Sequence, residues 1–114
     1  MSELSEKMRN YGIDVAETME RFVEDEDLYV ECLHEYLDNP DFDMLGDAIK
    51  TQDYVKAFDR AHTLKGVAGN MGLKPLFDVL CNIVEPLRVH DYSNLDPQYA
   101  DVMLEREKVM KALY

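Results

Sequence analysis

Basic residues are few in this sequence, and their scarcity limits the partners that the chain is expected to bind. Among its 114 residues, 12 are Lys or Arg and 24 are Asp or Glu, which gives a formal net charge of −12. No stretch gathers positive charge into a stripe. Phosphate backbones and anionic headgroups both attract basic surfaces, so neither nucleic acid nor a membrane is an expected partner.

Long apolar runs are missing as well. A helix that spans a bilayer needs about 20 consecutive apolar residues, and no run in the chain approaches that length. The first residues, Met1–Glu6, also lack the basic start and the apolar core of a signal peptide. We therefore expect a cytoplasmic protein, and Met1 with the compact length favours a free-standing protein over a piece of a larger sensor kinase.

The sequence offers little with which to hold a cofactor. Its five glycines form neither G-x-G-x-x-G nor a Walker pattern, so we do not expect the chain to bind ATP by itself. Cys32 and Cys81 form no C-x-x-C pair and lie in apolar helical stretches, where we expect buried free thiols. The three histidines, His34, His62 and His90, lack the spacing of metal ligands, so we expect no metal and no cofactor.

What the sequence does contain is helical periodicity. Hydrophobic residues make up 46% of the chain and recur every three or four positions, with no alternating strand pattern. We expect one domain over residues 1–114, all-α, folded as an antiparallel up-and-down four-helix bundle with a short additional N-terminal helix. The first three expected helices cover about residues 3–10, a short segment capped by Asp14, and residues 25–50 with an interruption at Pro40. The fourth covers about residues 54–71, and the fifth runs from Lys74 to just past Pro86. The last helix is capped by Asp96 and runs from Pro97 to about Leu113.

The fourth of these segments has two distinct faces. At about 100° per residue, one narrow sector of the helix carries mostly small side chains, which would let a neighbouring helix approach closely. This inner stripe consists of Ala57, Ala61, Leu64, Ala68 and Met71.

A second sector of the helix, well away from the inner stripe, carries His62, Lys65, Gly66 and Gly69. Each glycine should weaken a helix interior by about 1 kcal/mol relative to alanine. Two such glycines beside one histidine predict that bare backbone is needed there, so that a bulky group or a partner surface can come close. Gly72 has another role, as a helix C-cap in the left-handed conformation.

The exposed histidine suggests phosphoryl chemistry. A neutral imidazole is a good nucleophile near pH 7, because the pKa of an ordinary imidazole is about 6.5. A phosphoryl group on His62 would add negative charge, which the ammonium group of Lys65 one turn later would stabilise. A surface histidine beside a solvated lysine is the plainer interpretation, and periodicity alone favours it.

The residues from His62 to Gly72 resemble the signature of histidine-containing phosphotransfer (HPt) domains, and the resemblance extends over about residues 12–72. It implies that His62 is phosphorylated, that Lys65 and Gly66 are the motif's lysine and first glycine, and that Gly69 fills a position that the family keeps small.

The resemblance also implies a function. In such a phosphorelay carrier, His62 accepts a phosphoryl group from the aspartate of one receiver domain and passes it to another. The implied partners are receiver domains of response regulators, a hybrid sensor histidine kinase, or both. The chain would then be a transfer intermediate without a kinase or nucleotide site of its own, and we expect a monomer.

Two other functions remain open at this point. A helical module of the same shape could bind a receiver or a histidine kinase without carrying phosphate. A metal-binding bundle is the third possibility, but His34 and Glu35 are adjacent rather than at helical spacing, which makes that signal weak.

Two phenylalanines are candidates for docking a partner. Phe58 falls about 40° from His62 around the helix axis, outside the inner stripe. Counting back equally through the turn at residues 51–53 places Phe42 beside His62 on the preceding helix, with Pro40 nearby. We expect these side chains to form an apolar rim around the histidine, although both phenylalanines could instead belong to the core.

Overall fold

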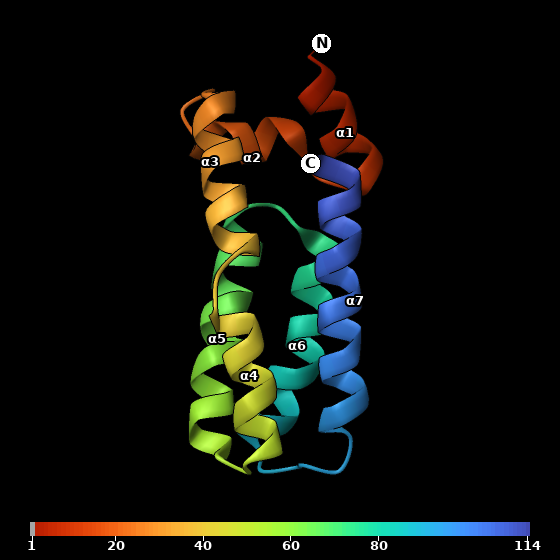
Figure 1. The fold of residues 1–114 in the computed structure, drawn as a ribbon. Helices are drawn as coiled ribbons and strands as arrows, with labels where there is room; N and C mark the ends of the chain where they lie inside the picture. Colours follow the sequence, from red (N-terminus) through yellow and green to blue (C-terminus); the bar gives the residue numbers. More distant parts are fainter. Residues whose placement is uncertain (1) are drawn as a thin grey trace.

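The structure is a computed structural model that describes residues 2–114. These residues form helices joined by short loops and contain no strand, so the prediction of an all-α chain is confirmed (Figure 1). The helices are α1 (Glu3–Tyr11), α2 (Val15–Arg21), α3 (Glu26–Leu37), α4 (Asp41–Lys50), α5 (Tyr54–Asn70), α6 (Lys74–Arg88) and α7 (Leu95–Leu113).

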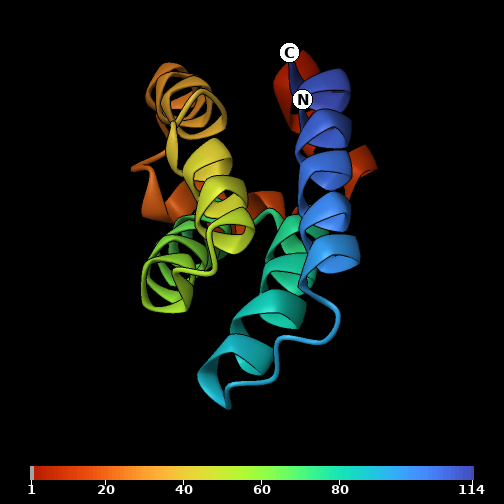
Figure 2. The ribbon, with the colours of Figure 1, turned by 60° about the horizontal axis from the view of Figure 1, so that its bottom comes forward.

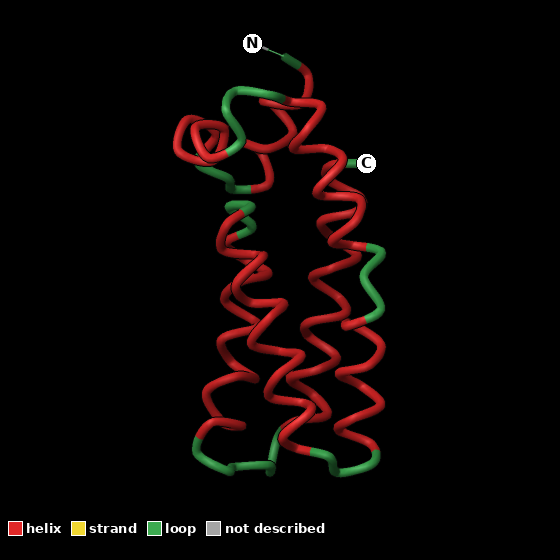
Figure 3. Tube along the Cα trace, turned by 90° about the vertical axis from the view of Figure 1, so that its left-hand side faces the viewer, coloured by secondary structure: helices red, strands yellow, loops and turns green. Residues whose placement is uncertain are grey.

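The long axis of the molecule is set by α4, α5, α6 and α7, which lie side by side and alternate in direction (Figure 1). In this group α4 contacts α5 and α7, and α6 contacts the same two helices from the other side. When the molecule is tilted so that its lower end comes forward, α4 and α5 (yellow and green) lie together on one side of α6 and α7 (teal and blue) (Figure 2). Most loops gather at the two ends of an elongated body that measures 46 × 21 × 20 Å (Figure 3).

The N-terminal helices occupy one end of this body. In Figure 1, α2 lies across the end, α1 packs against α7, and α3 continues the line of α4. The expectation named one additional N-terminal helix, whereas the structure has α1, α2 and α3 at this end. None of the helices in the described part of the chain combines the length and apolarity that crossing a membrane requires.

Aspartates begin three of the helices. Asp14, Asp25 and Asp53 each accept a hydrogen bond at the side chain from the backbone N–H three residues later, at 3.1, 3.0 and 3.2 Å. Such a bond satisfies one of the free donors of a helix start and stabilises it by about 1 kcal/mol. The cap predicted at Asp14 is thereby confirmed.

The last helix begins earlier than predicted. Asp96 and Pro97 resemble an N-cap followed by the first helical residue, yet α7 starts at Leu95 with Asn94 in the cap position. Leu95 is 3% exposed. Its burial accounts for the earlier start, and it places the carboxylate of Asp96 in the first turn, where the helix dipole favours negative charge.

The interruption predicted at Pro40 separates two distinct helices. α3 ends at Leu37, whose carbonyl accepts hydrogen bonds from Nε (2.8 Å) and a terminal nitrogen of Arg106 on α7. Pro40 then starts α4 with a φ of −63°, which its ring imposes. The two free cysteines are half-buried rather than fully buried.

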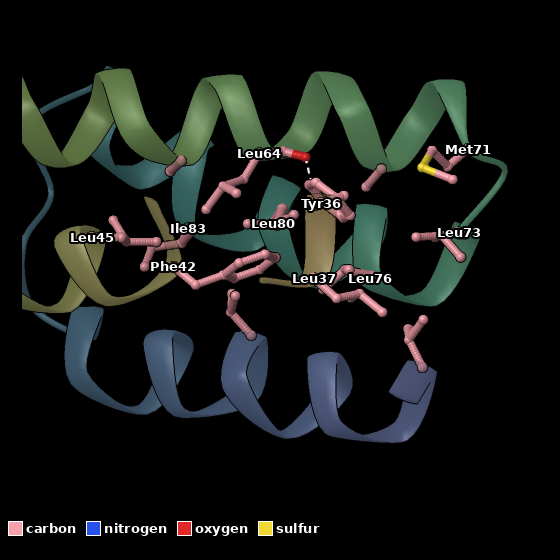
Figure 4. Packing of buried hydrophobic residues seen from close by; sticks show 14 of the residues in the cluster. Tyr36, Leu37, Phe42, Leu45, Leu64, Met71, Leu73, Leu76, Leu80 and Ile83 are labelled. Carbon is pink, nitrogen blue, oxygen red and sulfur yellow. Dashed lines mark hydrogen bonds between the residues drawn. The ribbon is translucent and has the colours of Figure 1, made fainter. Parts of the chain in front are cut away.

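The core runs the length of the molecule between α5 and α7 (Figure 4). The inner stripe of α5 is confirmed, since each of its five predicted residues is at most 2% exposed. Tyr36 of α3 points into this core and donates a hydrogen bond from its hydroxyl to the carbonyl of Leu64, at 2.7 Å (Figure 4). Burial raises the pKa of the Tyr36 phenol, so the hydroxyl keeps the proton that it donates.

Phe42 also belongs to this core, so its predicted place on a docking rim is wrong. Its side chain is 0% exposed, and its ring packs edge-on against Tyr36 with centroids 5.3 Å apart. The guanidinium of Arg106 covers the ring at 4.9 Å from its centroid. Counting back through the turn predicts the position of Phe42 along the axis of the bundle, but it does not predict which side of α4 the residue lies on. Phe42 lies on the side that faces the core.

Candidate functional site

The site centres on His62, which lies on the exposed face of α5. Side chains from two other helices hold the end of α5 by its last carbonyl groups. Nε of Arg21 donates to the carbonyl of Asn70 at 2.9 Å, and the hydroxyl of Tyr29 donates to that of Met71 at 3.0 Å. These bonds satisfy free acceptors of the helix end. His62 therefore sits on a helix that is anchored from behind while its outer face stays open.

The imidazole of His62 stacks on an aromatic neighbour. Its ring centroid lies 5.5 Å from that of Phe58, one turn earlier, and the two planes differ by 21°. Arg88 at the end of α6 places its guanidinium carbon 5.2 Å from the Phe58 centroid. Phe58 is half-buried, so the imidazole of His62 has an aromatic neighbour on one side of its ring.

The ring nitrogens of His62 are free within the part of the chain that the structure describes. No hydrogen bond joins either nitrogen to another described residue, and Asp59, which lies one turn earlier and is exposed, does not bond to the ring. An imidazole with an unoccupied nitrogen that faces solvent can act as a nucleophile.

Positive charge gathers on α5, although the chain as a whole is strongly acidic. The helix carries Lys56, Arg60 and Lys65 against one carboxylate, Asp59. Arg60 pairs with Asp41 of α4 at 3.0 Å, whereas Lys65 forms no ion pair within residues 2–114. Lys65 follows His62 by three residues and so lies on the same face of the helix. Its ammonium group is available to a new anion at the histidine.

The two glycines of this face are not required by the packing of the fold. A Cβ atom added at Gly66 would meet no other atom within 4 Å, and one added at Gly69 would make an ordinary 3.4 Å contact with the ring of Phe77. Their absence of side chains therefore leaves bare helix backbone beside His62. Gly72 does need to be glycine, since its φ of +72° is the left-handed conformation predicted for it.

The structure thus brings His62, Lys65, Gly66 and Gly69 onto one face, with Phe58 beside them, and removes Phe42 from the site. No group of three or more His, Cys, Asp or Glu side chains within residues 2–114 is arranged to hold a metal ion.

The sequence interpretation missed Arg88. A signal for it existed, because α5 and α6 form a hairpin around Leu73. Counting 15 residues in each direction from Leu73 pairs Phe58 with Arg88, the partner that the structure shows.

Comparison with protein families agrees with this geometry. Searches against curated proteins and against solved structures gave no match. The family model described as the Hpt domain matches residues 17–85, which is more than half of the chain and includes all of α5. The chain belongs to the Hpt domain family.

Proposed function

We propose that this protein is a phosphorelay carrier in two-component signal transduction, in which His62 takes a phosphoryl group from the aspartate of one receiver domain and passes it to another. Membership of the Hpt domain family implies a part in phosphorelay signalling. The observation that carries the finer proposal is the imidazole of His62, exposed and free of hydrogen bonds beside Lys65. We infer further that α4 to α7 act as the antiparallel four-helix unit that carries this histidine.

The transfer needs little from the chain beyond a nucleophile and its surroundings. The lone pair of an imidazole nitrogen attacks the phosphorus of the receiver's aspartyl phosphate, a P–N bond forms, and the P–O bond to the aspartate breaks. The carboxylate leaves with the electron pair of that bond. The imidazole ring gains one positive charge when its nitrogen is phosphorylated, and release of the proton on the other nitrogen to solvent restores a neutral ring. Transfer to the second receiver is the reverse reaction. Positioning and electrostatics supply most of the rate in such reactions, and the assisting metal ion comes with the receiver.

The partners under this proposal are receiver domains of response regulators, a hybrid sensor histidine kinase, or both. Under this proposal the chain is a transfer intermediate rather than an enzyme, because the phosphoryl group comes from a receiver and the transfer requires no kinase or nucleotide site in this chain. A module that binds receivers without carrying phosphate would have the same core. It would not need an open imidazole, an unpaired lysine and bare backbone on one face, which favours the carrier.

Phosphorylation should depend on His62 alone. We expect His62→Gln to abolish acid-labile, base-stable labelling by receiver domains that have been phosphorylated with acetyl phosphate, because no other residue supplies the nucleophile. His34→Gln and His90→Gln are matched controls that should keep the label, and circular dichroism should show equal helicity in all three. Label retained by the His62 variant would overturn the proposal.

Lys65 should matter for charge rather than for folding. We expect Lys65→Ala to slow transfer or to shorten the lifetime of the phosphohistidine, since the variant loses the cation nearest in sequence on that face. Lys56→Ala, on the same helix but further from His62, is the control. A transfer rate and a lifetime that both equal those of the wild type would remove Lys65 from the mechanism.

Gly66→Ala should make the protein more stable but slower in phosphoryl transfer. Alanine is the better helix former by about 1 kcal/mol, and its methyl group meets open space in the fold, so we expect the free energy of unfolding to rise. The same methyl group would stand between His62 and the approaching receiver, and transfer should fall by about tenfold. Thermal denaturation and transfer kinetics test the two effects separately, and unchanged transfer would show that bare backbone is not needed.

Phe58 should contribute to docking more than to stability. We expect Phe58→Ala to weaken receiver binding or transfer by about tenfold, the scale of a modest interface contact. Phe42→Ala is the matched control, because that ring is fully buried and its loss should cost about 3–5 kcal/mol of unfolding free energy. If Phe58→Ala loses as much stability as the control while the folded fraction still transfers normally, Phe58 is a core residue and docking occurs elsewhere.

A further inference from the structure

A groove opens next to the site, where the start of α5 meets the end of α6. Its volume is ≈ 430 Å³. Tyr54, Val55 and Phe58 of α5 form one wall, and Arg88 with His90 and Tyr92 of the loop between α6 and α7 form the other. Most of this lining is apolar or aromatic, in contrast to the acidic surface of the chain as a whole.

The groove has a fixed shape in the free protein. The rings of Tyr54 and Tyr92 stack with centroids 3.7 Å apart and planes 13° apart, which ties the loop to α5. The backbone N–H of Asp91 donates to the carbonyl of Pro86 at 2.8 Å, and His90 turns the chain with a φ of +61°. A partner would therefore meet a preformed groove and would lose little binding energy in ordering it.

Large apolar side chains are exposed to solvent on the surface around the groove. Val55 is 77% exposed, Val89 is 71% exposed and Tyr92 is 36% exposed, so three of the seven exposed large apolar side chains of the described residues lie at this end of α5 and α6. Single exposed apolar residues are ordinary, but a cluster beside a preformed groove is typical of a surface that binds another protein.

Phe58 joins this groove to the reactive histidine. Its ring lines the groove and also stacks on the imidazole of His62. A domain that brings its aspartyl phosphate to the nitrogen of His62 therefore comes next to Phe58 and the mouth of the groove. The charges suit the same partner, because α5 carries three cations against one carboxylate and the partner carries its reaction on an aspartate.

We propose that the groove receives an apolar side chain of the receiver domain that exchanges phosphate with His62, taken from the receiver's surface beside its reacting aspartate. This inference rests on the proposed function and adds a determinant of partner choice. The groove contacts the receiver away from the reacting atoms, so it contributes to binding and leaves the reactivity of the imidazole unchanged.

The test uses the full chain and substitutions at an exposed wall of the groove. Val55→Ser and Val55→Asp remove the apolar contact at the second residue of α5, where an acidic side chain also suits the helix start. Leu104→Asp is the matched control, because Leu104 is 57% exposed and lies on α7. Each protein is titrated with the receiver domain, from a purified panel, that phosphorylates the wild type fastest. Each is also treated with phosphoramidate, a small donor that needs no docking.

We expect both Val55 variants to bind the receiver at least tenfold more weakly, with unchanged phosphorylation by phosphoramidate, while Leu104→Asp matches the wild type in both. Wild-type affinity of the Val55→Ser protein would overturn the groove proposal and leave the carrier function intact. A dimer of the free protein that Val55→Asp dissociates would assign the groove to a second copy and also overturn it. If neither donor phosphorylates the wild type, the proposed function fails, and the groove proposal fails with it.

Discussion

The site depends on the way α5 buries one face against the core. Small side chains at Ala57, Ala61 and Ala68 let the neighbouring helices approach closely, and each is fully buried. The hydroxyl of Tyr36 then binds the carbonyl of Leu64 from within the core, close to the level of His62. Because these contacts fix the inner face, the outer face can carry an unpaired histidine, a lysine and two glycines without loss of the fold. The candidate site therefore lies on the solvent-facing side of a helix whose other side is packed into the core.

Local pattern predicted most of this face. Helical spacing alone placed the inner stripe of α5 and put His62, Lys65 and the two glycines on a second sector well away from it, because both placements depend on the geometry of a single helix. The aspartate caps were predictable for the same reason, since a cap acts within three residues of itself. The left-handed glycine at position 72 followed from its place after the last apolar residue of the stripe.

Features that depend on the relation between distant segments could not be predicted with the same success. The inward direction of Phe42 depends on how α4 restarts after the break at Pro40, which spacing along the chain does not specify. The groove depends on a stack between Tyr54 of α5 and Tyr92 of a loop 38 positions later, and no local signal marks such a pair. The place of Arg88 beside Phe58 could be predicted only by pairing residues at equal distances from the turn between α5 and α6.

The most direct test of the carrier function is whether phosphate on the protein moves onward. The wild type is phosphorylated, freed of its donor, and mixed with an unphosphorylated receiver domain and Mg²⁺, and the label on both proteins is followed over time. We expect the label to leave this protein and to appear on the receiver's aspartate, at a rate far above spontaneous loss. If the label stays on the protein, or is released as inorganic phosphate without ever reaching a receiver, the protein is not a carrier.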